Sequence, residues 1–329
     1  MRTSRRSLPT LFVAVAAGAA LTGCASAAPA TEGLSIVAST NVYGDIASSI
    51  AGDLASVTSI IESAAQDPHS YEASAQDQLA IAGADLVIEN GGGYDPFIDV
   101  LVAGSGSTAV IVSAVEAAGL VEDDHAEDDH ADEDHADDDH GDEEHAEDDH
   151  GHLDGVNEHV WYDVHVMGTV AAAIADALVS IDAENAGAYE QNLAAFEAEL
   201  ETLEGELERL GSELGGGTVA ATEPVPAYLL AELGFDDETP AEFSEAIEEG
   251  ADVPPLALQQ TLDLIDSGDV RLLAYNEQTA SPETERVRSA AEAAGIPVVS
   301  FTETLPDAQD YVSWMRANLE AIAAALTTP

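Results

Sequence analysis

Short runs rich in β-branched residues alternate with helical patterns along this chain, and this alternation restricts the fold more than any other sequence feature. Four runs in the first part of the chain have the pattern of buried strands; they span residues 34–39, 56–61, 84–89 and 108–112. Helical patterns separate them at residues 43–51, 74–82 and 95–103. Because strands that alternate with helices build sheets covered by helices, the pattern predicts an α/β fold.

A second set of such patterns follows three consecutive glycines at residues 215–217. The predicted strands span residues 218–221, 271–275 and 297–301, and the predicted helices span residues 226–233, 255–266, 281–294 and 307–326. We therefore expect two (β/α) lobes, each with a mainly parallel sheet.

Residues 166–214 connect the two predicted lobes and have a helical pattern. In their second part, apolar residues recur at spacings of four and three; they are Tyr189, Leu193, Phe196, Leu200, Leu203, Leu207, Leu210 and Leu214. Such a stripe is typical of a coiled-coil seam, so it fits a dimer zipper. A single long helix that packs against both lobes would use the same stripe. We favour this rigid brace, because the helix lies between two sheet-forming halves.

The first residues predict export. Three arginines precede an apolar run at residues 8–21, which is short and rich in Ala and Gly for a membrane span and is typical of a secretion signal. The run ends in Leu-Thr-Gly-Cys, and this Cys24 is the single cysteine of the chain, so it cannot form an internal disulfide. An ordinary cleavage site with an incidental cysteine would fit the same flank. However, Leu-x-Gly-Cys resembles a bacterial lipobox, in which the cysteine is lipidated and anchors a soluble body to the outer face of the membrane.

The predicted organisation follows from these segments. It consists of a signal peptide at residues 1–23, a flexible tether at 24–33, an N-terminal lobe at 34–165, connecting helices at 166–214 and a C-terminal lobe at 215–329.

The charge of the chain favours cations as ligands. There are 65 acidic residues against eight basic ones, and the net charge is −57. Such a charge repels nucleic acid and anionic lipid, so we expect neither as a binding partner. The hydrophobic fraction of 46% is nevertheless ample for folded cores.

A low-complexity tract at residues 122–152 holds part of this charge. Its histidines recur every five residues among carboxylates and are followed by one more; they are His125, His130, His135, His140, His145, His150 and His152. A period of five fits neither a helix face nor a strand face, so we predict a solvated, disordered loop. The tract could serve solubility alone. We favour a low-affinity collector of cations that raises their concentration near a tighter site.

Side chains that can bind metal follow strands in both predicted lobes. His69 follows the second strand, and His159 follows the fourth strand and the acidic tract. In the second lobe, Glu223 and Glu303 each follow a strand. Ligands of α/β sheets bind beyond the carboxyl ends of the strands. A single His or Glu in a loop is more often a capping or surface residue, but four such groups that converge would form a closed site for a divalent transition metal.

Several segments resemble those of the metal-binding lipoproteins of zinc and manganese ABC importers, the cluster A-I family. In chain order the matching segments are Asp67-Pro68-His69-Ser70-Tyr71-Glu72, Ala84-Asp85-Leu86-Val87-Ile88-Glu89-Asn90-Gly91, the acidic His-rich tract, Glu158-His159-Val160-Trp161-Tyr162-Asp163 and Ser300-Phe301-Thr302-Glu303-Thr304-Leu305. Glu223 also precedes Tyr228 by five residues, the spacing with which the family's third ligand precedes a tyrosine. The resemblance implies two (β/α) lobes joined by a long rigid helix. It also implies a metal at their interface, bound by His69, His159, Glu223 and Glu303.

The sequence leaves the identity of the metal open between zinc and manganese. Glu223 stands where zinc-type members usually carry His, and Glu303 is one methylene longer than the usual Asp. Hard carboxylates suit manganese, whereas the family associates a His-rich loop with zinc. We predict Zn²⁺ as the bound metal, with Mn²⁺ as the alternative.

We expect a structural or surface role for His165, and we expect Glu277 to line the cleft and orient a ligand without binding the metal itself.

The predicted function is the extracytoplasmic metal-binding component of an ABC importer, a monomer that delivers its metal to a permease with its ATPase. An enzyme is not expected, because the sequence has no His-Glu-x-x-His motif, no Gly-x-Ser-x-Gly motif and no phosphate-binding glycine loop. A metal store or chaperone without a permease would use the same cleft. A surface adhesin would bind a host molecule independently of metal.

Overall fold

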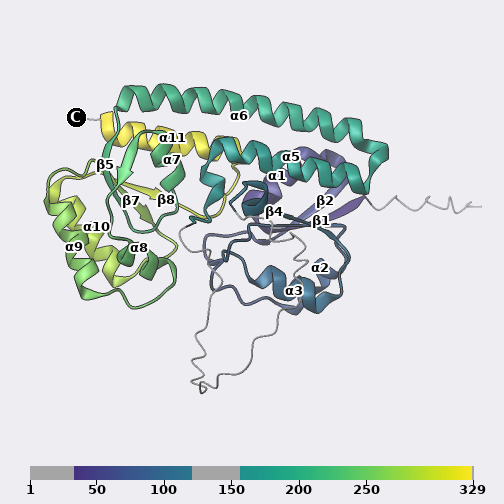
Figure 1. Ribbon diagram of the computed structural model, residues 1–329, viewed down its shortest axis with the longest axis horizontal. Helices are drawn as coiled ribbons and strands as arrows, with labels where there is room; N and C mark the ends of the chain where they lie inside the picture. Colours follow the sequence, from purple (N-terminus) through teal and green to yellow (C-terminus); the bar gives the residue numbers. More distant parts are fainter. Residues whose placement is uncertain (1–32, 121–155, 328–329) are drawn as a thin grey trace, which may run out of the picture. The chain divides into compact units, whose positions relative to one another are not determined.

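A computed structural model describes residues 33–120 and 156–327 (Figure 1). The predicted signal peptide, Cys24, the tether up to residue 32 and the seven histidines of the acidic tract lie outside these described residues.

The first lobe is built on a parallel four-stranded sheet with the order β2-β1-β3-β4. Its strands are β1 (Leu34–Thr40), β2 (Ala55–Ile61), β3 (Leu86–Glu89) and β4 (Val110–Ser113). The helices are α1 (Asn41–Ala51), α2 (Ala75–Ala82), α3 (Phe97–Ser105) and α4 (Ala114–Ala117). Side chains of β1 alternate between two apolar clusters, Ile36 on one face and Val37 on the other. Both faces of the sheet are therefore covered, as a parallel sheet requires.

The second lobe repeats this arrangement, with the strand order β6-β5-β7-β8 and parallel pairs throughout. Its strands are β5 (Gly217–Ala221), β6 (Phe235–Asp237), β7 (Leu273–Asn276) and β8 (Val298–Phe301). The helices are α7 (Ala227–Glu232), α8 (Ala241–Glu248), α9 (Pro255–Asp266), α10 (Pro282–Ala294) and α11 (Tyr311–Thr327). The two parallel sheets confirm the predicted α/β fold. Three elements, α4, β6 and α8, have no counterpart among the predicted strands and helices.

The connecting region contains two helices, α5 (Val164–Ile181) and α6 (Ala186–Leu214). The break lies at Asp182, whose Oδ2 accepts hydrogen bonds from Asn185 Nδ2 at 2.6 Å and Tyr189 Oη at 2.9 Å. This carboxylate stabilises the turn through local polar contacts. The spacing of apolar residues gives no signal for such contacts, so it does not locate the break. By length and composition α5 could cross a membrane, but its apolar residues are largely packed in the core.

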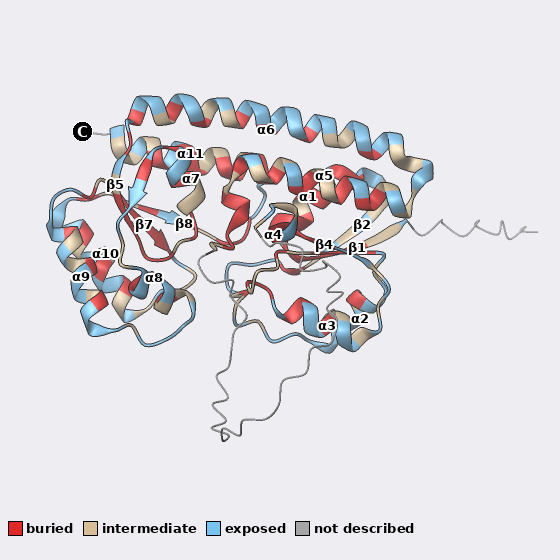
Figure 2. Cartoon of the chain, viewed as in Figure 1, coloured by how far each residue is buried: buried red, intermediate tan, exposed pale blue. Residues whose placement is uncertain are grey.

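The 29-residue helix α6 uses its apolar stripe inside the chain. It packs against α1 and α5 on the side of the first lobe and against α7 and α11 on the side of the second lobe (Figure 1). Seven residues of the stripe are buried, while the outer face of the helix is exposed (Figure 2). The predicted brace is confirmed. The stripe joins the apolar faces of both sheets into one continuous core.

Hydrogen bonds between the lobes supplement this shared core. The side chain of Asn41 donates to the Leu305 carbonyl at 3.0 Å and accepts from the Leu305 N–H at 2.9 Å. The Tyr311 N–H donates to Asp45 Oδ2 at 2.9 Å, and the Tyr311 hydroxyl donates to the Trp161 carbonyl at 2.7 Å. These bonds hold the two lobes in a fixed relation.

Replacing a buried residue of the stripe should reduce stability strongly. Leu203 is fully buried, so Leu203→Ala should lower the free energy of unfolding by about 2–5 kcal/mol, through lost burial and a residual cavity. Urea unfolding of the metal-free protein measures this change. Glu208→Ala, at an exposed position of the same helix, is the control and should change stability by less than about 0.5 kcal/mol. An unfolding midpoint that rises with protein concentration would instead show that the stripe stabilises a dimer.

Candidate metal centre

His69 lies in the loop that follows β2, and the Asp67 carboxylate shapes this loop. Asp67 Oδ1 accepts the backbone N–H of His69 at 3.0 Å, and Asp67 Oδ2 accepts the Ser70 hydroxyl at 2.7 Å. Pro68 between them is buried. A carboxylate that accepts hydrogen bonds from the residues just after it fixes a turn, so the sequence of this loop sets the direction of the His69 side chain.

His159 is only 1% exposed, and Asn157 orients its ring. Asn157 Oδ1 accepts the backbone N–H of His159 at 3.1 Å and lies 2.7 Å from His159 Nδ1. Because an amide oxygen only accepts, Nδ1 carries the proton and Nε2 keeps its lone pair. Asn157 Nδ2 donates to the Pro224 carbonyl at 2.9 Å, and the Tyr228 hydroxyl donates to the Asn157 carbonyl at 2.7 Å. Asn157 therefore ties His159 to the second lobe.

Glu223 and Glu303 follow β5 and β8 and are 3% and 2% exposed. Asn276 ends β7, which lies between these strands in the sheet. Its amide nitrogen donates to Glu223 Oε2 and, at 2.7 Å, to Glu303 Oε1. The Glu303 N–H donates to Gln278 Oε1 at 2.7 Å. The carboxyl ends of three neighbouring parallel strands thus bring both carboxylates to one point.

Glu277 has a different position from the one expected. Its carboxylate is exposed and accepts the Ser300 hydroxyl at 2.9 Å. Consecutive side chains point to opposite sides of extended backbone, so Asn276 reaches the two carboxylates and its neighbour does not.

Tyr94 joins the groups of the two lobes. It is fully buried, and its hydroxyl donates to Glu303 Oε2 at 3.2 Å. Its ring centroid lies 4.9 Å from that of His69 and 5.7 Å from that of His159, and the two imidazole centroids are 6.1 Å apart. The structure therefore places all four sequence-predicted ligands around Tyr94 and Asn276. That these four bind the metal stays a prediction.

Glu248 was not predicted and lies beside the same imidazoles. One potential ligand atom each from His69, His159 and Glu248 lie within 4.8 Å of one another. Glu248 Oε1 is 3.6 Å from His159 Nδ1. The residue ends α8, a short helix whose signal in the sequence is weak: a proline at its N-cap and two apolar residues four apart, Phe243 and Ile247.

These carboxyl groups have raised pKa values because they are buried together. Burial is the main cause for Glu223, whose pKa rises to about 7, and for Glu303, whose pKa rises to about 8 with a further contribution from the Glu223 charge. Burial and then the charges of Glu158, Glu223 and Glu303 raise the pKa of Glu248. Within residues 33–120 and 156–327, no arginine forms an ion pair with Glu223, Glu248 or Glu303. A divalent cation would supply the missing positive charge, and the mixed imidazole and carboxylate donors fit a transition metal.

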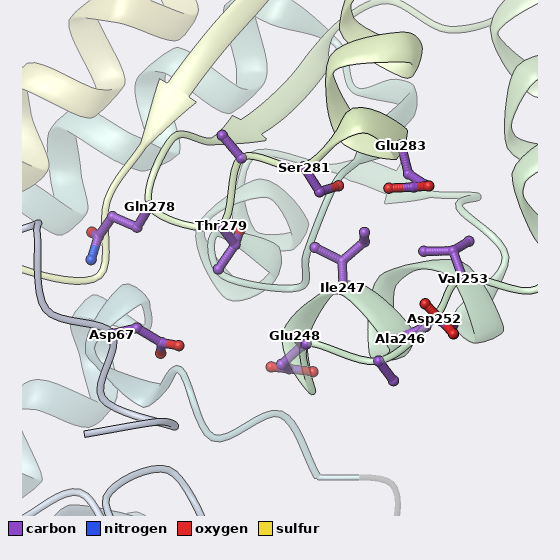
Figure 3. A pocket seen from close by; sticks show the side chains of 13 residues that line it. Asp67, Ala246, Ile247, Glu248, Asp252, Val253, Gln278, Thr279, Ser281 and Glu283 are labelled. Carbon is purple, nitrogen blue, oxygen red and sulfur yellow. The ribbon is translucent and has the colours of Figure 1, made fainter. Parts of the chain in front are cut away.

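A cavity of about 280 Å³ adjoins this cluster. Figure 3 shows Asp67 of the first lobe on one side and Glu248 on the other, with Gln278 and Thr279 nearby. Asp67 and Glu248 make the lining of the cavity acidic beside this cluster. His165, by contrast, has a side chain that is 84% exposed and lies 3.3 Å from Glu204, so it takes the surface role expected for it.

Known proteins resemble this chain over most of its length. Residues 36–325 match the family described as ZnuA, zinc-uptake complex component A, periplasmic. The manganese-binding lipoprotein MntA of Halalkalibacterium halodurans is 28% identical over 163 residues, which are 49% of this chain and 44% of that protein. The manganese ABC transporter substrate-binding lipoprotein PsaA of Streptococcus anginosus is 29% identical over 196 residues, 57% of this chain and 55% of that protein. The chain thus spans about half the length of these curated relatives.

A solved structure resembles the fold more completely. The crystal structure of ZnuA superposes with a TM-score of 0.68 at 22% identity and covers 90% of this chain and 100% of that one. At this identity the likeness concerns the fold.

The metal-free protein should become more stable as the pH falls from about 8 to about 5. Glu223 and Glu303 have folded-state pKa values near 7 and 8 against an ordinary value of 4.5. Their contribution to stability is therefore fully present below the ordinary pKa and is lost as the pH rises through the folded-state values. Thermal unfolding across this range measures the effect. In Glu303→Gln the dependence should be shallower, and an equal slope in this variant would assign the effect to other groups.

Asn157 should matter for metal affinity although it binds no metal in this arrangement. Asn157→Ala removes the acceptor that fixes the His159 ring, so the dissociation constant should rise about 10–100-fold. Asn157→Asp keeps an acceptor oxygen and should retain most of the affinity. Competition with a chromophoric chelator measures both. Equal losses in the two variants would mean that the contact with Pro224, which both variants lose, is the important one.

Proposed function

Because the chain belongs to the family of periplasmic zinc-uptake complex component A, we propose that it is the extracytoplasmic metal-binding component of an ABC importer. The observation that carries this proposal is the convergence of two imidazoles from the first lobe with buried carboxylates from the second. Burying several carboxylates together is unfavourable unless a cation compensates them. The site thus has the chemistry of a divalent cation trap.

The proposed ligands are His69, His159, Glu223 and Glu303. Asn276 holds the two carboxylates, Asn157 holds one imidazole, and Tyr94 lies between the groups of the two lobes. Such positioning contacts keep the donors in place before the metal arrives, which favours tight binding. The shared core and the long helix limit rotation of the lobes. Release would therefore use small movements of the loops that carry Glu223 and Glu303 when the permease docks.

We propose Zn²⁺ as the cargo. Imidazole and carboxylate are both zinc ligands, and the family description names zinc uptake. The His-rich tract supports the same choice as a low-affinity collector whose loss would leave the tight site intact.

Manganese is a second candidate with specific support. The third ligand is a glutamate, a third carboxylate lies nearby, and hard oxygen donors suit Mn²⁺. The two curated relatives are named for manganese.

The proposed partners are an ABC permease with its ATPase and, through a lipid at Cys24, the outer face of the cell membrane. The family and the names of the relatives support this assignment.

Proteins of this family are binding components of transporters and not enzymes. The chain should act as a monomer, because the α6 stripe packs within the chain. Nucleic acid is disfavoured as a partner by the net charge of −57.

Titration of the metal-stripped protein with Zn²⁺ and Mn²⁺ tests this function. Calorimetry on a variant without residues 122–152 should find one tight site per chain, since the proposed ligands all lie outside the deleted tract. His159→Ala should weaken binding at least about 100-fold, because it removes one ligand of the buried site. Loss of tight binding on deletion of the tract would contradict its accessory role.

Co-purification with a permease would distinguish an importer component from a metal store. Metal-independent binding to a host molecule would favour an adhesin.

A further inference from the structure

We propose that Glu248 is a fifth metal-binding side chain of this centre and that it shifts the preference of the site from zinc toward manganese. This inference rests on the proposed function, since it concerns the same metal.

The position of Glu248 relative to the imidazoles is the first argument. Its carboxylate and one nitrogen of each of His69 and His159 lie within 4.8 Å of one another, a span that a single ion can bridge. Glu248 Oε1 is buried and makes no hydrogen bond to any described residue, although the side chain as a whole is 11% exposed. A buried carboxylate oxygen without a donor is unfavourable, and a metal ion would satisfy it.

The way α8 holds Glu248 is the second argument. Phe243 and Ile247 anchor the helix in an apolar cluster, and the chain turns away at Gly250, which has a positive φ of 63°. Glu248 therefore sits in the last turn of its helix, where the carbonyl dipoles disfavour negative charge. The same carboxylate also lies near the charges of Glu158, Glu223 and Glu303. Folding alone gives no reason for an acid there, whereas binding of a cation does.

Coordination chemistry gives the consequence for the choice of metal. Two imidazoles and two carboxylates supply the four donors that zinc prefers. A third carboxylate raises the number of donors above four and adds hard oxygen, which suits the six-coordinate preference of manganese. Glu248 also lines the adjoining cavity, so it is placed to meet an ion that enters from there.

The variant Glu248→Gln tests the proposal, and Glu249→Gln is the matched control. Glu249 is the exposed neighbour, so its substitution makes the same change of net charge one residue away. Glutamine keeps a polar oxygen near His159 Nδ1, 3.6 Å away in the wild type, but it is a poor metal ligand. A role limited to this polar contact would therefore survive in Glu248→Gln, and a role as ligand would not.

Mn²⁺ and Zn²⁺ affinities of both variants and the wild type are measured by competition. In Glu248→Gln the Mn²⁺ dissociation constant should rise at least about tenfold, and the Zn²⁺ constant should rise less than about threefold. Co²⁺ provides an independent readout, because its visible absorption is more intense in four-coordinate sites. The Co²⁺ absorption of Glu248→Gln should be stronger than that of the wild type and of Glu249→Gln.

Thermal unfolding of metal-free Glu248→Gln should show no loss of stability, since glutamine has nearly the same size and brings no negative charge into this acidic site. If Glu248→Gln matches Glu249→Gln in both affinities and in the Co²⁺ spectrum, Glu248 is not a ligand. Equal losses of Zn²⁺ and Mn²⁺ affinity would overturn the shift in preference. If the wild type binds neither metal tightly, the proposed function itself fails, and this outcome is distinct from the other two.

Discussion

The packing of the α6 stripe against both lobes is the interaction on which the geometry of the metal centre depends. The stripe joins the apolar faces of the two sheets, so the carboxyl ends of β5, β7 and β8 stay opposite the loops that carry His69 and His159. A flexible linker would leave each lobe with half of a donor set. In this chain the folded core fixes the distance between the donors of the two lobes. A large opening would break that core, so it would cost part of the free energy of folding.

This rigidity has an electrostatic consequence. Glu223, Glu248 and Glu303 are held in place, and burial is the main cause of their raised pKa values; neighbouring carboxylates raise the pKa values of Glu248 and Glu303 further. At neutral pH these carboxyl groups therefore carry protons in part. If the proposed ligands bind a cation, binding at neutral pH would displace these protons, and affinity would depend on pH through carboxylates as well as through imidazoles. Asn276 moderates the repulsion because one amide donates to two of the carboxylates.

Much of the fold could be predicted because its signals are periodic and local. The seven predicted strands correspond to β1–β5, β7 and β8 of the structure, with ends that shift by at most two residues. β6 gave no signal, because it has three residues and two of them are exposed aspartates. α8 was missed because eight residues with two apolar anchors form no distinct stripe. Glu277 was expected in the cleft, but β7 ends one residue later than predicted, and Asn276 at its end reaches the carboxylates instead. The apolar spacing of α6 fits both a coiled-coil dimer and a helix that packs against both lobes of one chain. Only the packing of the whole chain distinguishes the two.

The missed helix also bears on the choice between metals. Zinc binds most nitrogen and oxygen sites more tightly than manganese, so a protein can favour manganese only through the number, hardness and geometry of its donors. The ligands predicted from sequence alone amount to four, a number that suits zinc. Glu248 lies outside every segment that carries the family resemblance. It also belongs to α8, a helix that was not predicted from the sequence. Under the proposal for Glu248, the contribution of α8 to the donor set would distinguish a four-coordinate zinc site from a higher-coordinate manganese site on the same scaffold.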